Sequence, residues 1–194
     1  MTRLALLRSA SLAVALLASA SAGAQDAPAQ DAPSRPQMNL ALLGGVAGVG
    51  TKEQGAWETS RLFAAFHADV LLGRTSTRSW GIGPMARVGT YGFSDAQAQL
   101  GASLLVPVHD YLPFVLTAGG YTRLTEGREP GAFASLFWGT RSFNYHGSYV
   151  MAGGLVVETR ATFGDQAERT VIIAGHADLQ AIALPVVMLI NAFR

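Results

Sequence analysis

The sequence predicts an all-β fold, an eight-stranded antiparallel up-and-down transmembrane β-barrel with a short C-terminal helix. Segments of roughly 9–11 residues alternate between apolar and small or polar side chains, which is the pattern of a tilted strand crossing a bilayer. Only 14% of the 194 residues are charged, and Lys52 is the single lysine, whereas soluble domains carry about 25% charged residues. The 22 glycines suit tight turns and a crowded barrel interior.

The segment 61–74 shows the strand pattern most clearly. Every second residue from Ala64 to Leu72 is apolar, and the positions between them include His67 and Asp69. Because successive side chains of a strand point to opposite faces, one face of this strand is apolar and the other is mixed. We expect the apolar face to meet lipid and the mixed face to line the interior of the barrel.

The N-terminal region is predicted to direct export. Residues 1–24 combine Arg3 and Arg8 with an apolar run too short to be a good membrane-spanning helix, which is typical of a secretory signal peptide. An A-x-A site predicts cleavage after Ala24. Residues 25–38 are rich in Pro, Ala and polar residues without periodicity, so we expect a disordered linker.

The predicted barrel covers residues 39–184. Proline has no N–H to donate, so Pro84 predicts a bulge or local distortion inside its strand. Eight antiparallel strands can close on themselves, and closure is necessary in lipid because no water is present to satisfy an open edge. The predicted strands are 39–50, 61–74, 80–91, 96–108, 112–123, 131–141, 149–162 and one from 170 to about 184.

Alternation assigns side chains to each face of this barrel. The residues expected to face lipid are Phe66, Val70, Leu100, Leu104, Val106, Phe114 and Leu116. The residues expected to form a polar network in the lumen are His67, Asp69, Arg87, Glu158, Arg160, His176 and Asp178. Nine aromatic residues near segment ends predict girdles at the two membrane interfaces: Trp57, Trp80, Tyr91, Phe93, Tyr111, Tyr121, Phe143, Tyr145 and Tyr149.

The C-terminal segment 185–194 differs from the strands. Its apolar residues Val186, Leu189, Ile190 and Phe193 have helical spacing, and Pro185 suits the first position of a helix. We expect a short apolar helix that lies at the membrane surface or against the barrel mouth.

These features together resemble the small eight-stranded outer-membrane barrels of the OmpA/OmpX type. The resemblance covers residues 39–184 and rests on the export signal, the eight alternating segments, the short turns and the aromatic strand ends, without a sequence motif. It implies location in a bacterial outer membrane. Such barrels usually end on an aromatic residue, whereas this chain ends on Arg194.

The tripeptide His-Ala-Asp occurs at 67–69 and again at 176–178, and in a strand its His and Asp share one face. The pair could serve a metal or catalysis, or it could belong to a network of paired lumen charges. The two strands are separated by one other strand, which predicts a separation of roughly 10 Å, too far for joint coordination. We favour the charge network and predict no catalytic residue, no metal and no cofactor.

The predicted function is that of an integral outer-membrane barrel of structural or interaction type with a lumen filled by side chains. Outer-membrane lipid is the expected partner, the protein partner is unknown, and the formal net charge of +1 predicts no binding of nucleic acid. Three alternatives stay open: a narrow conduit or binding barrel for small apolar molecules, a lipid-modifying enzyme with Ser103, Ser135 or Ser148 as nucleophile, and a soluble lipocalin-like barrel.

Overall fold

The computed structural model describes residues 33–51, 53, 55–125, 129–163 and 167–192 of the chain. The predicted signal peptide 1–24 and most of the predicted linker lie outside these residues. The structure contains eight strands and one described helix: β1 (Gln37–Gly50), β2 (Thr59–Leu71), β3 (Gly81–Tyr91), β4 (Asp95–Val106), β5 (Phe114–Arg123), β6 (Pro130–Arg141), β7 (Ala152–Thr162), β8 (Arg169–Asp178) and α2 (Leu179–Ala192).

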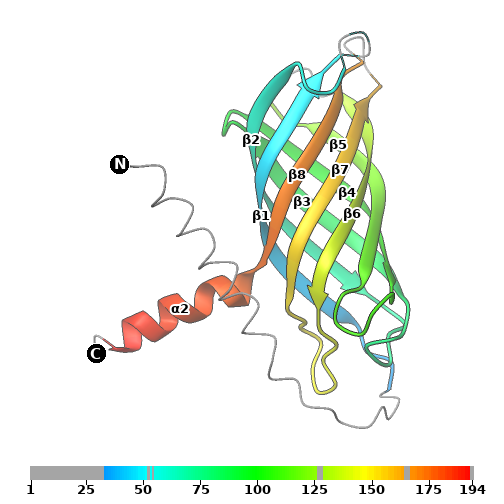
Figure 1. The fold of residues 1–194 in the computed structure, drawn as a ribbon, viewed down its shortest axis with the longest axis vertical. Helices are drawn as coiled ribbons and strands as arrows, with labels where there is room; N and C mark the ends of the chain where they lie inside the picture. The colour runs from blue at the N-terminus through cyan, green and yellow to red at the C-terminus, as the bar shows by residue number, and fades with distance from the viewer. Residues whose placement is uncertain (1–32, 52, 54, 126–128, 164–166, 193–194) are drawn as a thin grey trace. The chain divides into compact units, whose positions relative to one another are not determined.

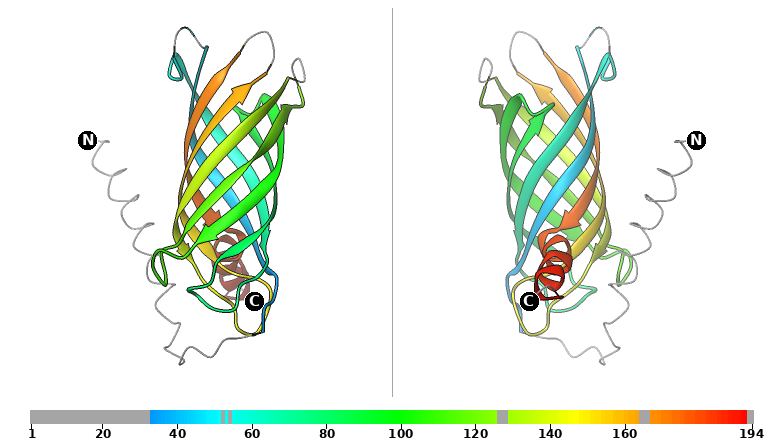
Figure 2. Two further views of the ribbon diagram at one scale, coloured as in Figure 1. Left: turned by 90° about the vertical axis from the view of Figure 1, so that its right-hand side faces the viewer. Right: turned by 90° about the vertical axis from the view of Figure 1, so that its left-hand side faces the viewer.

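The eight strands form one closed antiparallel barrel (Figure 1). Each strand pairs with the next in sequence, and β8 pairs with β1 from Ala41↔Asp178 to Gly50↔Arg169, which closes the sheet. Figure 2 shows the strands running obliquely around the barrel. We call the end where β1 begins and β8 finishes the lower end, and the opposite end the upper end. The predicted all-β fold, an antiparallel barrel of eight strands followed by one C-terminal helix, is confirmed.

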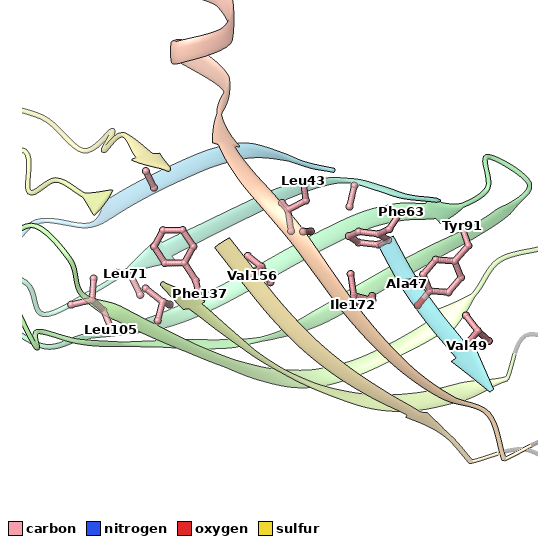
Figure 3. Packing of buried hydrophobic residues seen from close by; sticks show 14 residues of the cluster. Leu43, Ala47, Val49, Phe63, Leu71, Tyr91, Leu105, Phe137, Val156 and Ile172 are labelled. Atoms are coloured by element: carbon pink, nitrogen blue, oxygen red, sulfur yellow. The ribbon is translucent and has the colours of Figure 1, made fainter. Parts of the chain in front are cut away.

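Alternation along each strand separates an inner from an outer face. In β6, Phe133, Ser135 and Phe137 are buried, whereas Ala134 and Leu136 between them are exposed. Figure 3 shows apolar side chains from several strands packed together inside the barrel, among them Leu43, Ile172 and Phe137. The period of two in the sequence is thus the period of burial.

Glycines on the inner face allow neighbouring strands to approach closely. Gly101 and Gly119 are opposite each other on β4 and β5. A Cβ atom added at Gly119 would collide with the backbone of Leu100 and Gly101. These glycines are therefore required by the closeness of two strands and not by a turn.

The distortion expected at Pro84 is an interrupted ladder without a bulge. The pairing of β3 with β4 continues in one register through Pro84↔Ala102. The pairing of β2 with β3 stops at Asp69↔Met85 and resumes as the single bridge Leu72↔Ile82. Pro84 lies in this gap, where it has no N–H to donate to β2.

Several predicted boundaries are wrong, including the end of the last strand, which lies at Asp178 rather than near residue 184. β1 begins at Gln37 rather than at residue 39, because Gln37 and Met38 pair with Leu71 and Val70 of β2. The helix begins at Leu179 rather than at Pro185, and Pro185 lies inside it. No helix among the described residues is long and apolar enough to cross a membrane.

The aromatic residues are divided between the inside and the outside of the barrel. Tyr91, Tyr121 and Phe143 are buried, so their assignment to interfacial girdles is wrong, because they lie at inward positions close to strand ends. Tyr145 packs against Phe143 with 4.7 Å between ring centroids, and Tyr149 is half-buried. Near the ends of the described strands, the exposed aromatic residues are Trp57, Phe93 and Phe163 at the upper end and Trp80, Tyr111 and Trp138 toward the lower end.

Candidate functional site in the barrel lumen

The outer face of the eight strands is almost free of charge. At the outward positions of these strands, all of which the structure describes, the only charged residue is Arg169, the first residue of β8. Three residues predicted to face lipid are exposed there, Phe66 (42%), Leu100 (71%) and Leu116 (47%). The other four, Val70, Leu104, Val106 and Phe114, occupy the same face and are half-buried by their neighbours.

The inner face holds all of the predicted network residues. Each is buried, with an exposed fraction between 1% and 7%. Charges withdrawn from water to this degree must be paired or hydrogen-bonded. The residues are His67, Asp69, Arg87, Glu158, Arg160, His176 and Asp178.

Glu158 on β7 is the centre of the largest charge cluster. Its carboxylate accepts hydrogen bonds from Arg87 on β3 and from Arg160 on β7. Gln99 on β4 donates a third hydrogen bond at 2.9 Å. One carboxylate thus pairs with two guanidinium groups, and the neutral amide satisfies a further lone pair.

The guanidinium group of Arg160 lies among three aromatic rings. Its Cζ atom is 5.3 Å from the ring centroids of Phe63 and Tyr91 and 5.4 Å from that of Tyr121. Arg160 also donates to the side-chain oxygen of Gln97. The rings attract the cation through their quadrupoles, so the upper half of the lumen is filled by aromatic and charged groups packed together.

A second ion pair lies nearer the lower end. Arg141 at the end of β6 donates two hydrogen bonds of 2.8 Å to Asp69 on β2. The Nε atom of Arg87 approaches His67 Nδ1 at 3.4 Å, which connects this region with the Glu158 cluster. Arg141 was absent from the predicted network although it occupies an inward position of its strand. The excess of acids over arginines in the predicted set was the signal that another cation was needed.

Asp178 is the junction of a third cluster. Its carboxylate accepts a hydrogen bond of 2.7 Å from Asn39 Nδ2 and one of 3.0 Å from the Tyr149 hydroxyl. Asn39 Oδ1 lies 3.0 Å from His176 Nε2. Neither Asn39 nor Tyr149 was predicted as a network residue, because the glycines of β1 weaken its alternation and Tyr149 was assigned to an interfacial girdle.

The predicted separation of the two His-Ala-Asp motifs is wrong. The rings of His67 and His176 lie 5.5 Å apart, measured between centroids. The prediction applied the spacing of a flat sheet, whereas inward side chains of a narrow barrel converge on its axis. The described residues contain no group of three or more His, Asp or Glu side chains arranged to hold a metal ion.

The candidate serine nucleophiles have other neighbours. Ser103 Oγ lies 3.1 Å from Thr117 Oγ1, Ser135 is buried opposite Glu158 on the neighbouring strand, and Ser148 is exposed in the β6–β7 loop. A cavity of about 10 Å³ lies beside His67 and His176, which is roughly the space of one water molecule. The lumen around the two histidines is therefore filled by paired charged groups and leaves little room for a substrate.

Side chains also close the lower end of the barrel. Arg74 in the β2–β3 loop is fully buried, its guanidinium lies 5.2 Å from the ring centroid of Phe143, and it donates to the carbonyl of Ser142 at 3.3 Å. Burial lowers the pKa of Arg74 to about 10, so the group is still cationic at neutral pH. The β6–β7 loop, residues 142–151, is thereby held beneath the lumen.

The upper mouth contains a further ion cluster that alternation alone did not reveal. Arg123 lies 3.1 Å from Asp95 Oδ2 and 2.8 Å from Glu168 Oε2. Thr125 donates a hydrogen bond of 3.1 Å to Asp95. Paired charges thus continue from the lower end to the upper end of the lumen.

No family model, curated protein or solved structure matches the chain.

Proposed function

We propose that the protein is an integral barrel of the bacterial outer membrane, of structural or interaction type, with a lumen filled by its own side chains. In class it is similar to the small OmpA/OmpX-type barrels. The observation that carries the proposal is the polarity of the wall. Apolar residues cover the outside of the strands, while the buried charged residues are paired or hydrogen-bonded inside. A soluble lipocalin-like barrel would have the opposite polarity.

The size of the barrel supports this proposal. The strands contain 10 to 14 residues. At about 3.3 Å per residue and a tilt of about 40°, they rise about 23–33 Å. This height agrees with an apolar band of about 25 Å in outer-membrane barrels. Exposed aromatic residues toward both ends, such as Phe93 and Trp80, suit the two interfaces.

The filled lumen favours a structural or interaction role over transport. The Glu158 cluster, the Asp69–Arg141 pair and the Asp178 cluster occupy successive levels of the interior, and each is hydrogen-bonded across the barrel. A solute passing along the axis would have to break these pairs. An eight-stranded barrel has an interior just wide enough for such side chains.

Two measurements test this proposal. The full chain is expressed with its own N-terminal segment, cells are fractionated, and the outer-membrane fraction is run on a gel with and without boiling. We expect a band whose mobility changes on boiling, as the folded barrel resists detergent. Purified protein is then inserted into vesicles loaded with a small fluorescent solute, and leakage is expected to equal that of protein-free vesicles. A protein that is soluble without detergent would contradict the membrane location, and specific leakage would favour the conduit.

A further inference from the structure

The helix α2 is an apolar element that little of the described structure covers. Among its 14 residues, Gln180 and Asn191 are the only polar ones, and none is charged. A helix that is apolar on all sides is normally buried. Several of its large side chains are nevertheless exposed: Ile182 (40%), Leu184 (54%), Met188 (70%), Leu189 (59%) and Ile190 (53%).

The first turn of α2 is attached to the barrel wall. Asp178 Oδ1 accepts hydrogen bonds from the backbone N–H groups of Gln180 at 2.8 Å and Ala181 at 3.4 Å, which is the arrangement of a helix N-cap. The same carboxylate binds Asn39 and Tyr149 inside the barrel. Because Asp178 is 2% exposed, the helix start is held at the lower rim, where the outer face of β8 ends.

The lumen has no space for α2. At the lower end Gln37, Arg74 and Val150 are buried to 1% exposure or less. Gln37 also donates to the carbonyl oxygens of Asn144 and Gly147 in the β6–β7 loop, each at 3.3 Å. The helix could enter only by displacing this loop, so its apolar surface must be covered from outside the barrel.

We propose that α2 lies in the interfacial layer of the bilayer, beside the lower rim of the barrel, with its apolar side chains among the lipid acyl chains. This inference rests on the proposed membrane location. The outer face of the strands ends at Ala177, and α2 continues its apolar surface two residues later. The lipid that contacts the barrel wall is therefore the partner nearest to the helix.

The length and the proline of α2 agree with a position along the membrane surface. Fourteen residues rise about 21 Å, which is less than the ~30 Å of the hydrocarbon core. Pro185 has no N–H, so the carbonyl of Ala181 lacks its usual helical partner. Water can satisfy that carbonyl at the interface, whereas the hydrocarbon core contains none.

The chain has no cysteine, so a fluorophore can be attached at single introduced positions to measure depth. Met188→Cys places the probe on α2. Leu100→Cys places it on the outer face in the middle of β4, and His146→Cys places it on an exposed loop residue at the lower end. Each full-length variant carries an environment-sensitive fluorophore and is folded into vesicles whose lipids bear a nitroxide near the headgroup or deep in the acyl chain.

We expect the Met188→Cys probe to emit at a blue-shifted wavelength and to be quenched at least twofold more by the shallow nitroxide than by the deep one. The Leu100→Cys probe should show the opposite preference, and the His146→Cys probe should be quenched little by either. Water-like emission from Met188→Cys, with normal quenching of Leu100→Cys, would overturn the inference for α2 alone. Absence of quenching at Leu100→Cys would overturn the membrane location as well.

A second copy of the chain is the other occupant that the measurement must exclude. The Met188→Cys variant is therefore labelled with a donor and acceptor pair at several protein-to-lipid ratios. We expect no energy transfer above that of randomly distributed barrels. Energy transfer that persists on dilution into excess lipid, together with a blue shift that lipid nitroxides do not quench, would show that α2 packs against another copy.

Discussion

The inner and outer faces of the same strands carry different kinds of side chains. On β7, Val157 is 49% exposed and its neighbour Glu158 is 1% exposed. One residue along the strand separates an apolar side chain on the outside from the carboxylate that organises the interior. Whether a residue occupies an odd or an even position along its strand therefore decides whether its side chain points into the lumen or outward. A single layer of backbone thus separates two different environments.

The two faces also depend on each other. The outer face carries almost no charge, and the buried charged residues pair with one another inside. There Arg87 and Arg160 bind Glu158, and Arg141 binds Asp69. A paired charge inside a barrel keeps its hydrogen bonds, whereas an unpaired one costs several kcal/mol. The following substitutions either exchange these environments or remove a partner from one of them.

The largest effect is expected when Glu158 is removed. Glu158→Leu leaves Arg87 and Arg160 without their common carboxylate, and breaking a buried ion pair typically costs about 3–5 kcal/mol. The measurement is urea unfolding of the protein in vesicles, followed by tryptophan fluorescence. The matched control is Val157→Ala on the outer face of the same strand, which should cost clearly less. Equal costs for the two variants would mean that the Glu158 cluster contributes no special stability.

A charge on the outer face should have the next largest effect. Leu100→Arg places a guanidinium on the outer face at the middle of β4 and should cost about 2–4 kcal/mol, because this position is expected near the bilayer midplane. Ala96→Arg lies on the same face of the same strand but close to its upper end, and its cost should be about 0–1 kcal/mol. Unfolding in vesicles measures both, and a cost independent of depth would contradict the proposed membrane position.

A smaller difference in stability is expected between alanine substitutions of an inward and an outward glycine. Gly119→Ala adds a methyl group on the inner face, where it would collide with the backbone of β4, and the crowding should cost about 1–3 kcal/mol. Gly44→Ala adds the same group on the outer face, where nothing lies within 4 Å of the added atom. The free energy of unfolding of that variant should equal that of the wild type or exceed it by less than about 1 kcal/mol. The same unfolding assay applies, and a reversed order would show that the two faces are wrongly assigned.

The smallest effect is expected outside the strands. Arg78 and Asp110 join the β2–β3 and β4–β5 loops through an exposed ion pair, with Arg78 Nη2 2.9 Å from Asp110 Oδ2. Hydrogen bonds from Arg78 lower the pKa of Asp110, so any stabilisation from this carboxylate is present above its ordinary pKa and is lost as the pH falls through the lowered value. Arg78→Ala should return the pKa of Asp110 toward its ordinary range in an NMR titration. Global stability should not change, because exposed ion pairs contribute little.

The sequence predicted the fold and the contents of the lumen because both depend on local alternation. Each of the seven network residues and each of the seven outward residues lies on the face that its parity assigned. What alternation could not provide is the position of one strand relative to another. The ion pair between Arg141 and Asp69 and the contact between His67 and His176 require the curvature of the closed barrel.

The helix boundary was missed for a different reason. Pro185 looked like a start because proline suits the first turn of a helix. The actual start is determined by Asp178, whose carboxylate caps α2 while it also binds Asn39 across the barrel. From the sequence, Asp178 could be recognised only as an inward residue of a strand, and its role as the cap of α2 could not be predicted.

The most direct test of the account is a nitroxide scan along residues 96–105 of β4, one position at a time, in the protein folded into lipid vesicles. At the even-numbered, outward positions we predict high accessibility to oxygen, which dissolves in hydrocarbon, and low accessibility to a water-soluble nickel complex. At the odd-numbered, inward positions we predict low accessibility to both. Outward positions that collide freely with the nickel complex would place this face in water and contradict the account.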